Sequence, residues 1–173
     1  NFKKPQLAII LGSGLDSFVK KIKNKTVIKY AEIPGLVKTS VKGHSGELIF
    51  GDINDIPILC ASGRFHYYEG HSFEKVSTII NIINGLNIKL CIITNSSGCL
   101  NLKWKLGSFM LANKFIDYSF INSSFPQFHT ISPNKYFNAI LKVAKKENLA
   151  INVGAYTFTT GPSYETPAEI KDI

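Results

Sequence analysis

The stretch IPILCASGRFHYYEGHSFEKVSTIINIING, residues 56–85, contains three different patterns in succession. Residues 56–63 are almost entirely apolar, which predicts a buried β-strand. Residues 63–72 are a polar segment rich in side chains that form hydrogen bonds. Residues 73–85 repeat apolar side chains at helical spacing and end at a glycine, which predicts a helix. A strand, a polar loop and a helix in this order indicate an α/β fold.

The same alternation continues on both sides of this stretch. Apolar or β-branched runs closed by Gly, Ser, Asn or Pro predict further strands. These runs are LAII (7–10), ELIFGDI (47–53), KLCIITNSSG (89–98), FMLANKFI (109–116) and INVGAYTFTTGP (151–162). SPNKYFNAILKVAKKENL (132–149) predicts a second helix, with Ser132 as N-cap and a basic last turn. We therefore expect an α/β domain with a central sheet covered by helices on both faces.

Length and composition predict one globular domain spanning residues 1–173. The chain is 45% apolar, which is enough for one substantial core. Its formal charge of +8 comes from 20 Lys and Arg against 12 Asp and Glu. Most of the excess consists of single lysines among Asn and Ile, and no Lys/Arg run is interleaved with aromatic residues. A compositional bias is favoured over a nucleic-acid surface, so we expect no nucleic-acid partner.

The cysteines and the apolar runs bear on location. Cys60, Cys91 and Cys99 lie in or beside apolar runs without metal-ligand spacing, which is typical of buried thiols in a reducing compartment. The run LAIIL (7–11) is too short for a secretory signal, and no later run approaches the length of a membrane span. These features predict a cytoplasmic protein with no membrane partner.

Four polar clusters each follow directly after a predicted strand. They are GSGL (12–15), GRFHYYEG (63–70), TNSSG (94–98) and TGPSYETP (160–167). In open α/β sheets, ligands bind in the crevice outside the strand ends. We therefore expect the four loops to converge on one pocket.

The side chains of the first two clusters favour an anion as ligand. A Gly-Ser-Gly turn at Ser13 lets the backbone approach a ligand closely and supplies N–H groups and a hydroxyl. Arg64 presents a planar donor fork that matches phosphate or carboxylate. His44 and His66 are further loop donors. Each feature alone is also compatible with a plain turn or a structural histidine, but together they favour an oxyanion site.

The last two clusters leave alternatives open. TNSSG is either a plain left-handed turn or a loop that places an amide and hydroxyls beside a ligand. In the fourth cluster, Tyr164 can stack on a flat ring while Glu165 accepts hydrogen bonds from ring N–H groups. Alternatively, Tyr-Glu-Thr (164–166) only caps the helix that begins at TPAEI.

Five segments, in chain order, resemble the motif series of purine nucleoside phosphorylases of the trimeric class, within the nucleoside phosphorylase superfamily. They are LGSGL, GHSGELIFG, GRFHYYEGHS, TNSSGCLN and GPSYETPAE, and the resemblance covers about residues 7–173. It implies a phosphorylase/hydrolase-like three-layer α/β fold with a central mixed β-sheet flanked by helices. The implied activity is that of a pentosyltransferase in purine salvage. An enzyme of this family catalyses reversible phosphorolysis of 6-oxopurine ribo- or deoxyribonucleosides to the free base and (deoxy)ribose 1-phosphate.

The resemblance also implies partners and site residues. Inorganic phosphate is the co-substrate, no metal or organic cofactor takes part, and the assembly is a homotrimer. The implied phosphate ligands are Ser13, His44, Arg64, His66, Asn95 and Ser96. The implied nucleoside-binding residues are Tyr68 at the ribose and Ser97, Gly98, Tyr164 and Glu165 at the base. Of all these, His66, Tyr68 and Glu165 are the implied catalytic residues.

Three departures from the family pattern affect these expectations. The segment INSSFPQFHTI (121–131) is shorter than the family's loop, and Phe125 is the candidate for the aromatic residue that this loop lends to a neighbouring subunit. Ser96 stands where alanine is common and adds a hydroxyl. The family continues past the position of Ile173 with a strand pair and a helix that complete the base and ribose sites. We therefore expect a domain that is incomplete at its C-terminus and turns over poorly alone.

Two alternative functions stay open. A methylthioadenosine phosphorylase of the same superfamily would also use Ser13, Arg64 and His66. Glu165 argues against it, because a carboxylate accepts from the N–H edge of a 6-oxopurine. The other alternative is a truncated, inactive nucleoside-binding homologue.

Overall fold

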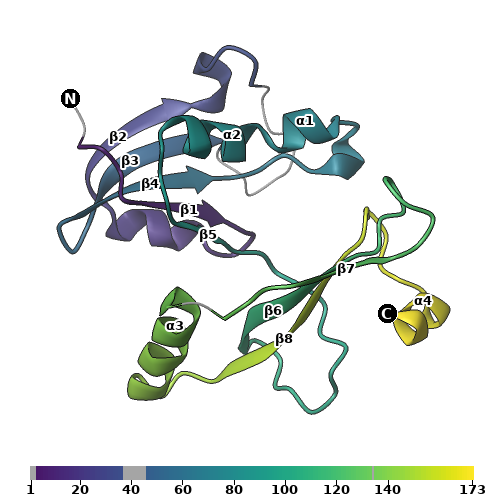
Figure 1. The fold of residues 1–173 in the computed structure, drawn as a ribbon. Helices are drawn as coiled ribbons and strands as arrows, with labels where there is room; N and C mark the ends of the chain where they lie inside the picture. Colours follow the sequence, from purple (N-terminus) through teal and green to yellow (C-terminus); the bar gives the residue numbers. More distant parts are fainter. Residues whose placement is uncertain (1–2, 37–45, 134) are drawn as a thin grey trace. The chain divides into compact units, whose positions relative to one another are not determined.

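The computed structural model describes residues 3–36, 46–133 and 135–173. The chain forms two compact units, Asn1–Ser97 and Gly98–Ile173. Each unit is built around its own β-sheet, with five strands in the first and three in the second (Figure 1).

The sheet of the first unit is mixed. Its strand order is β2 (Lys23–Lys29), β3 (Glu47–Ile53), β4 (Ile56–Ser62), β1 (Leu7–Leu11) and β5 (Cys91–Ile93). The first three strands in this order are antiparallel, whereas β1 runs parallel to both β4 and β5. Because parallel strands point the same way, the loops that follow β1, β4 and β5 all emerge at one edge of the sheet.

Both faces of this sheet are buried. Alternate residues of a strand point to opposite faces, so Ala8 and Ile10 pack with Ile79 and Ile83 of α2 (Thr78–Gly85). On the other face, Cys60 belongs to a second apolar cluster, against which the 3-10 helix η1 (Asp16–Lys21) also packs. The sheet therefore lies between α2 and η1 (Figure 1), which explains why β1 and β4 are almost entirely apolar.

The second unit has a smaller sheet with strand order β7 (Gln127–Thr130), β6 (Phe109–Asp117), β8 (Ile151–Phe158). β6 pairs antiparallel with β7 and parallel with β8. The chain passes from β7 to β8 through helix α3 (Lys135–Lys146), and α4 (Pro167–Asp172) follows β8.

The predicted fold class is confirmed: the described residues form mixed sheets flanked by helices. The strands are shared between two sheets, a division that the apolar pattern did not predict. The strands β2 and β7 were also not predicted. Nearly all of their residues are exposed, so they show no apolar run. The strand predicted at 89–98 is confined to Cys91–Ile93.

The predicted helices differ from the observed ones at their ends. The helix expected at 73–85 is divided into α1 (Phe73–Val76) and α2 by Ser77, whose ψ of −4° departs from the α-helical value. The helix expected at 132–149 begins only at Lys135, so Ser132 is not its N-cap. It ends at Lys146, before Asn148, whose φ of 53° is left-handed. Among the described residues, no helix is long and apolar enough to cross a membrane.

Candidate functional site

Three of the four polar clusters lie together at one edge of the first sheet. The loops after β1 (12–15), β4 (63–70) and β5 (94–97) leave strands that are parallel neighbours. Gly46, which precedes β3, lies at the same edge, because its N–H donates to the carbonyl of Ser62 at 2.9 Å. His44, the remaining predicted phosphate ligand of this unit, lies outside the described residues.

Direct contacts join the loops after β1 and β5. The N–H of Gly12 donates to Thr94 Oγ1 at 2.9 Å, and the hydroxyl of Ser96 donates to the carbonyl of Ser13 at 3.0 Å. A Cβ atom at position 12 would lie 2.5 Å from Asn95 Cα, so only glycine permits this approach. Ser13 and Ser96, both predicted phosphate ligands, are thus neighbours in space.

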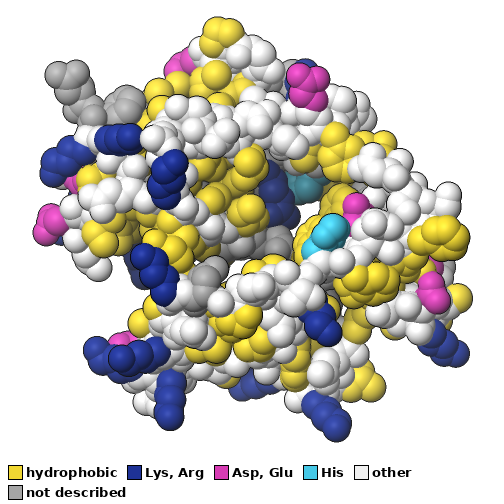
Figure 2. Space-filling model, in the orientation of Figure 1, with side chains coloured by type: hydrophobic (Ala, Val, Ile, Leu, Met, Phe, Trp, Pro, Cys, Tyr) yellow, Lys and Arg dark blue, Asp and Glu magenta, His cyan; other side chains and the backbone are white. Residues whose placement is uncertain are grey.

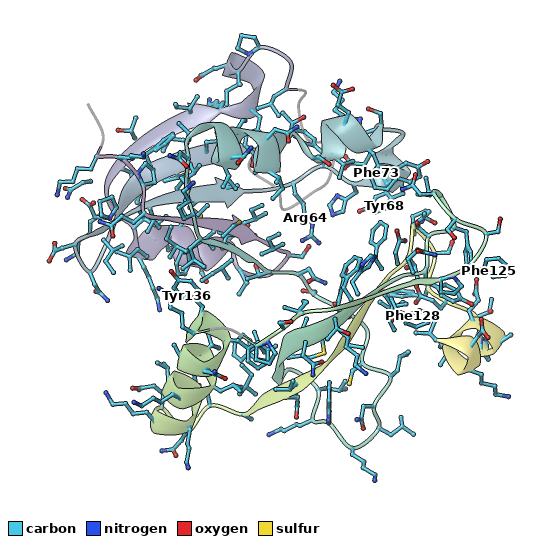
Figure 3. The ribbon with its side chains drawn as sticks, in the orientation of Figure 1. Arg64, Tyr68, Phe73, Phe125, Phe128 and Tyr136 are labelled. Carbon is cyan, nitrogen blue, oxygen red and sulfur yellow. The ribbon has the colours of Figure 1, made fainter. Side chains whose placement is uncertain are left out.

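Arg64 is held by both the second and the third loop. Its Nη1 donates to the carbonyl of Thr94 at 2.9 Å, and its Nε donates to His66 Nε2 at 3.3 Å. An arginine N–H is always a donor, so Nε2 of His66 is the acceptor in this pair. Figure 3 shows Arg64 on the segment that follows β4.

The other side of the His66 ring faces a carboxylate. Its Nδ1 lies 3.2 Å from Glu69 Oε2, and the same oxygen accepts the backbone N–H of His66 at 2.7 Å. With Nε2 accepting from Arg64, a neutral His66 carries its proton on Nδ1 and donates it to Glu69. The glutamate side chain is only 5% exposed. Its hydrogen bond to Nδ1 fixes the orientation of the His66 ring.

A buried aromatic pair anchors this loop. The hydroxyl of Tyr30 donates to the carbonyl of Gly63 at 2.7 Å, and the ring of Tyr30 packs on that of Phe65, with centroids 5.5 Å apart. Burial raises the pKa of Tyr30 well above its ordinary value, so its hydroxyl stays protonated and remains a donor. Phe65 is buried, so the backbone that carries its neighbours Arg64 and His66 is packed against the core.

Tyr68 stacks on His66, with ring centroids 4.9 Å apart and an interplanar angle of 20°. Its side chain is otherwise half-exposed (Figure 3). The predicted ribose ligand is therefore in contact with a predicted phosphate ligand, and one face of the phenol ring is covered by imidazole.

The TNSSG cluster is a largely exposed loop with internal hydrogen bonds, and none of its residues has a left-handed φ, so the alternative of a plain left-handed turn is wrong. The side-chain amide of Asn95 donates to the carbonyl of Ser96 at 3.3 Å and to the hydroxyl of Ser97 at 2.6 Å. Because Ser96 donates its hydroxyl proton to Ser13, it offers lone pairs, not a proton, to any other group in this arrangement. The predicted extra donor at position 96 is thus committed to the neighbouring loop.

The fourth cluster belongs to the second unit, as does Gly98, and follows β8. Glu165 Oε1 accepts a hydrogen bond from Thr159 Oγ1 at 2.8 Å, which orients the carboxylate. Tyr164 is 95% exposed. The cap of α4 is Thr166, whose hydroxyl accepts the N–H of Glu169 at 3.3 Å. The capping alternative is therefore correct for Thr166, while Tyr164 and Glu165 take no part in the cap.

Phe125 lies in the turn that precedes β7 (Figure 3) and is 75% exposed. Ser123 orders this turn, because its hydroxyl accepts the N–H of Phe125 at 3.1 Å and the amide of Gln127 at 2.9 Å. The aromatic ring is thus presented to solvent from a hydrogen-bonded turn.

Sequence analysis did not single out Thr94 and Glu69. Glu69 stands three residues after His66, a spacing that suits a carboxylate bonding back to the start of a helical turn. No comparable local pattern marks Thr94, whose hydroxyl partner is 82 residues away.

The surface shows Lys and Arg side chains singly or in small groups on the face drawn in Figure 2. Helix α3 contains Lys145 and Lys146 in its last turn.

The fold and the loop cluster define an α/β protein with a polar, arginine-containing site at the carboxyl edge of parallel strands. Comparison with known proteins identifies the family: residues 6–173 match the model of the phosphorylase superfamily, and the chain belongs to that superfamily.

Individual relatives are named purine nucleoside phosphorylases. The chain is 33% identical over 180 residues to purine nucleoside phosphorylase 1 of Bacillus subtilis, an alignment covering 98% of this chain and 66% of the relative. It is 32% identical over 184 residues to the Rattus norvegicus enzyme, covering 96% of this chain and 63% of the relative. The chain thus spans slightly less than two thirds of the length of these relatives.

The fold is also similar to solved structures of purine nucleoside phosphorylases. Isoform 2 of purine nucleoside phosphorylase from Schistosoma mansoni, in complex with cytosine and ribose-1-phosphate, matches with a TM-score of 0.81 and 31% identity. The match covers 97% of this chain and 65% of that chain. A second Schistosoma mansoni structure matches with a TM-score of 0.82 and 33% identity, covering 98% of this chain and 68% of that one.

Proposed function

We propose that the protein is a purine nucleoside phosphorylase acting on 6-oxopurine nucleosides such as inosine and guanosine. The names of its relatives support this proposal. The observation that carries it is the cluster around Arg64, which joins two loops at the carboxyl edge of the first sheet. A guanidinium held by a backbone carbonyl and an oriented imidazole suits a phosphate dianion.

In this proposal, the first unit holds the phosphate. Its ligands are Ser13, His44, Arg64, His66, Asn95 and Ser96, and the hydroxyl of Ser96 must leave the carbonyl of Ser13 to donate to phosphate. Arg64 supplies the positive charge, and the hydrogen bond from Nδ1 of His66 to Glu69 fixes which way the ring faces. For His66 to donate to phosphate from Nε2, phosphate must replace the Arg64 Nε–H as the partner of that nitrogen, because a nitrogen that accepts from Arg64 carries no proton.

Tyr68 contacts the ribose in the proposed complex, and Ser97, Gly98, Tyr164 and Glu165 contact the base. Phosphate oxygen attacks the anomeric carbon as the glycosidic C–N bond breaks, so the sugar passes through an oxocarbenium-like state. The anion held by Arg64 acts as nucleophile and also stabilises the positive charge on the sugar. The departing purine takes one proton and leaves as the neutral base, and the attacking hydrogen phosphate loses one proton as it becomes the sugar phosphate dianion.

Glu165 is proposed to set base specificity. Its carboxylate accepts from Thr159, which leaves the second oxygen to accept the N1–H of hypoxanthine or guanine. Adenine presents an unprotonated N1 acceptor at that position, so two acceptors would face each other. This mismatch disfavours adenosine and methylthioadenosine, the substrate of the runner-up function.

The remaining expectations complete the proposal. Residues 1–173 act as a single domain, the protein works in the cytoplasm as a homotrimer, and it needs phosphate but no metal or organic cofactor. Phe125, exposed on its turn, is the residue proposed to reach a neighbouring subunit's sugar site.

Steady-state assays of the purified protein with inosine, adenosine and methylthioadenosine, each with and without inorganic phosphate, test the proposal. We expect residues 1–173 alone to turn over inosine slowly and only with phosphate, with kcat/KM about 10²-fold above that of adenosine. Preference for methylthioadenosine would support the runner-up enzyme. Equal rates without phosphate would indicate a hydrolase, and binding of nucleoside without turnover would indicate an inactive homologue.

A further inference from the structure

We infer that Thr94 is a positioning residue that sets both the Gly12–Gly14 loop and Arg64 for phosphate. The inference rests on the proposed function for its catalytic readout. Thr94 follows β5 directly and lies between the loop after β1 and the guanidinium of Arg64, which emerges after β4.

The Thr94 hydroxyl forms one accepted and one donated hydrogen bond with the β1 strand and its loop. It accepts the backbone N–H of Gly12 at 2.9 Å and donates to the carbonyl of Ile10 at 3.0 Å. The backbone N–H of Thr94 also donates to Ile10 O at 3.0 Å. One side chain therefore joins the end of strand β1 to the start of its polar loop.

The backbone of Thr94 meets Arg64. Its carbonyl accepts from Nη1 at 2.9 Å, so displacement of this peptide displaces the guanidinium as well. A Cβ atom at position 12 would lie 2.6 Å from the carbonyl oxygen of Thr94, so the two loops are closely packed here. Loss of the hydroxyl releases the Gly12 N–H and loosens the Thr94 peptide that holds Arg64, while the bond from the Thr94 N–H to Ile10 remains.

A valine at this position tests the role of the hydroxyl, because it keeps the shape of threonine but neither donates nor accepts. Serine keeps the hydroxyl without the methyl group. Thr78→Val is the matched control: its hydroxyl also donates to a backbone carbonyl, that of Glu74 at 3.3 Å, and this bond stays within the α1–α2 region.

For Thr94→Val we expect the KM for phosphate to rise about tenfold, because valine loses the hydrogen bond that holds the Gly12 N–H as well as the bond to the carbonyl of Ile10. The KM for inosine should change less than about twofold, a difference below 0.5 kcal/mol. Thr94→Ser should restore the phosphate KM, and Thr78→Val should leave it unchanged. A purely structural role for Thr94 would instead lower the amount of folded protein without shifting the phosphate KM.

Two measurements need no catalysis. Hydrogen exchange at the Gly12 amide should be faster in Thr94→Val than in the unaltered protein and in Thr94→Ser. Titration with inorganic phosphate, followed by thermal stability, should show weaker binding by Thr94→Val. If the protein turns over no nucleoside, the proposed function fails while these two measurements still decide the role of Thr94.

Unchanged Gly12 exchange together with an unchanged phosphate response in Thr94→Val would overturn the inference. Equal losses in Thr94→Val and Thr94→Ser would also overturn it, because the methyl group would then matter and the hydroxyl would not. If Thr94→Val does not fold, the serine variant decides alone: normal exchange and normal phosphate binding support the role of the hydroxyl, and impaired values contradict it.

Discussion

Gly12→Ala should push apart two loops that the site needs together. The added Cβ would lie 2.5 Å from Asn95 Cα, 2.6 Å from Thr94 O and 2.9 Å from Asn95 N. All three are backbone atoms, so no side-chain rotation relieves the contacts. The φ of Gly12 lies outside the left-handed region, so the cost of the substitution is steric and not a matter of backbone conformation.

The size of the effect follows from these distances. An ordinary contact begins at 3.4 Å, so the loops must separate by about 1 Å. Overpacking of this kind costs about 1–3 kcal/mol. The hydrogen bond from Gly12 to Thr94 would stretch as well and lose about 0.5–1.5 kcal/mol. We expect a loss of about 2–4 kcal/mol in the free energy of unfolding.

Denaturant unfolding followed by circular dichroism measures this loss, and phosphorolysis of inosine measures the effect on the proposed site. A displacement of about 1 Å should lower kcat/KM by roughly 10²-fold. Gly85→Ala is the control, since a Cβ there meets nothing within 4 Å and helical alanine is favoured over glycine. If Gly12→Ala and Gly85→Ala were equally stable and equally active, the close approach of the two loops would be wrong.

Four further outcomes are expected. Arg64→Ala should raise the phosphate KM by roughly 10–150-fold and the inosine KM much less, because it removes charge-assisted hydrogen bonds; equal effects on both constants in steady-state kinetics would contradict the phosphate role. Glu165→Gln should lower kcat/KM for inosine by roughly 10–100-fold and reduce the preference over adenosine, which a two-substrate assay checks. Burial raises the pKa of the Cys60 thiol from 9.0 to about 12. The folded state then keeps a proton that the unfolded chain loses, so the free energy of unfolding should fall as pH rises from 9 to 12. Denaturation across that range should show a shallower decline for Cys60→Ala. Gly154→Ala would place a Cβ 2.7 Å from Cη2 of Trp104 and should destabilise the second unit by about 1–3 kcal/mol. Unfolding followed by fluorescence of this single tryptophan measures it, and an unchanged midpoint would contradict the packing.

The sequence alone predicted the buried strands well. β3 has the predicted bounds, and β1 and β4 differ from prediction by one residue at one end. These strands pack against other elements on both faces, so nearly every residue must be apolar and the run is visible in the sequence. β2 was not predictable in this way. It lies at the edge of the sheet with mostly exposed residues, and pairing with β3 defines it as a strand.

The sequence also located the polar clusters, because residues that break a strand and form hydrogen bonds stand out against apolar runs. Arg64 and His66 were singled out on that ground, and the order of the motifs indicated the family. The roles assigned to these residues stay predictions. The sequence predicts which polar side chains follow β1, β4 and β5, because the end of each strand can be recognised from neighbouring residues alone.

Only the tertiary structure decided which of these groups meet. The parallel pairing of β1 with β4 and β5 brings their loops to one edge, although the loops are far apart in the chain. The contact of Gly12 with Thr94, across 82 residues, follows from that pairing. The residues next to a hydroxyl or an N–H in the sequence do not indicate its distant partner. A hydrogen bond requires the two atoms to lie within a few tenths of an ångström of the ideal distance, and only the folded chain sets that distance.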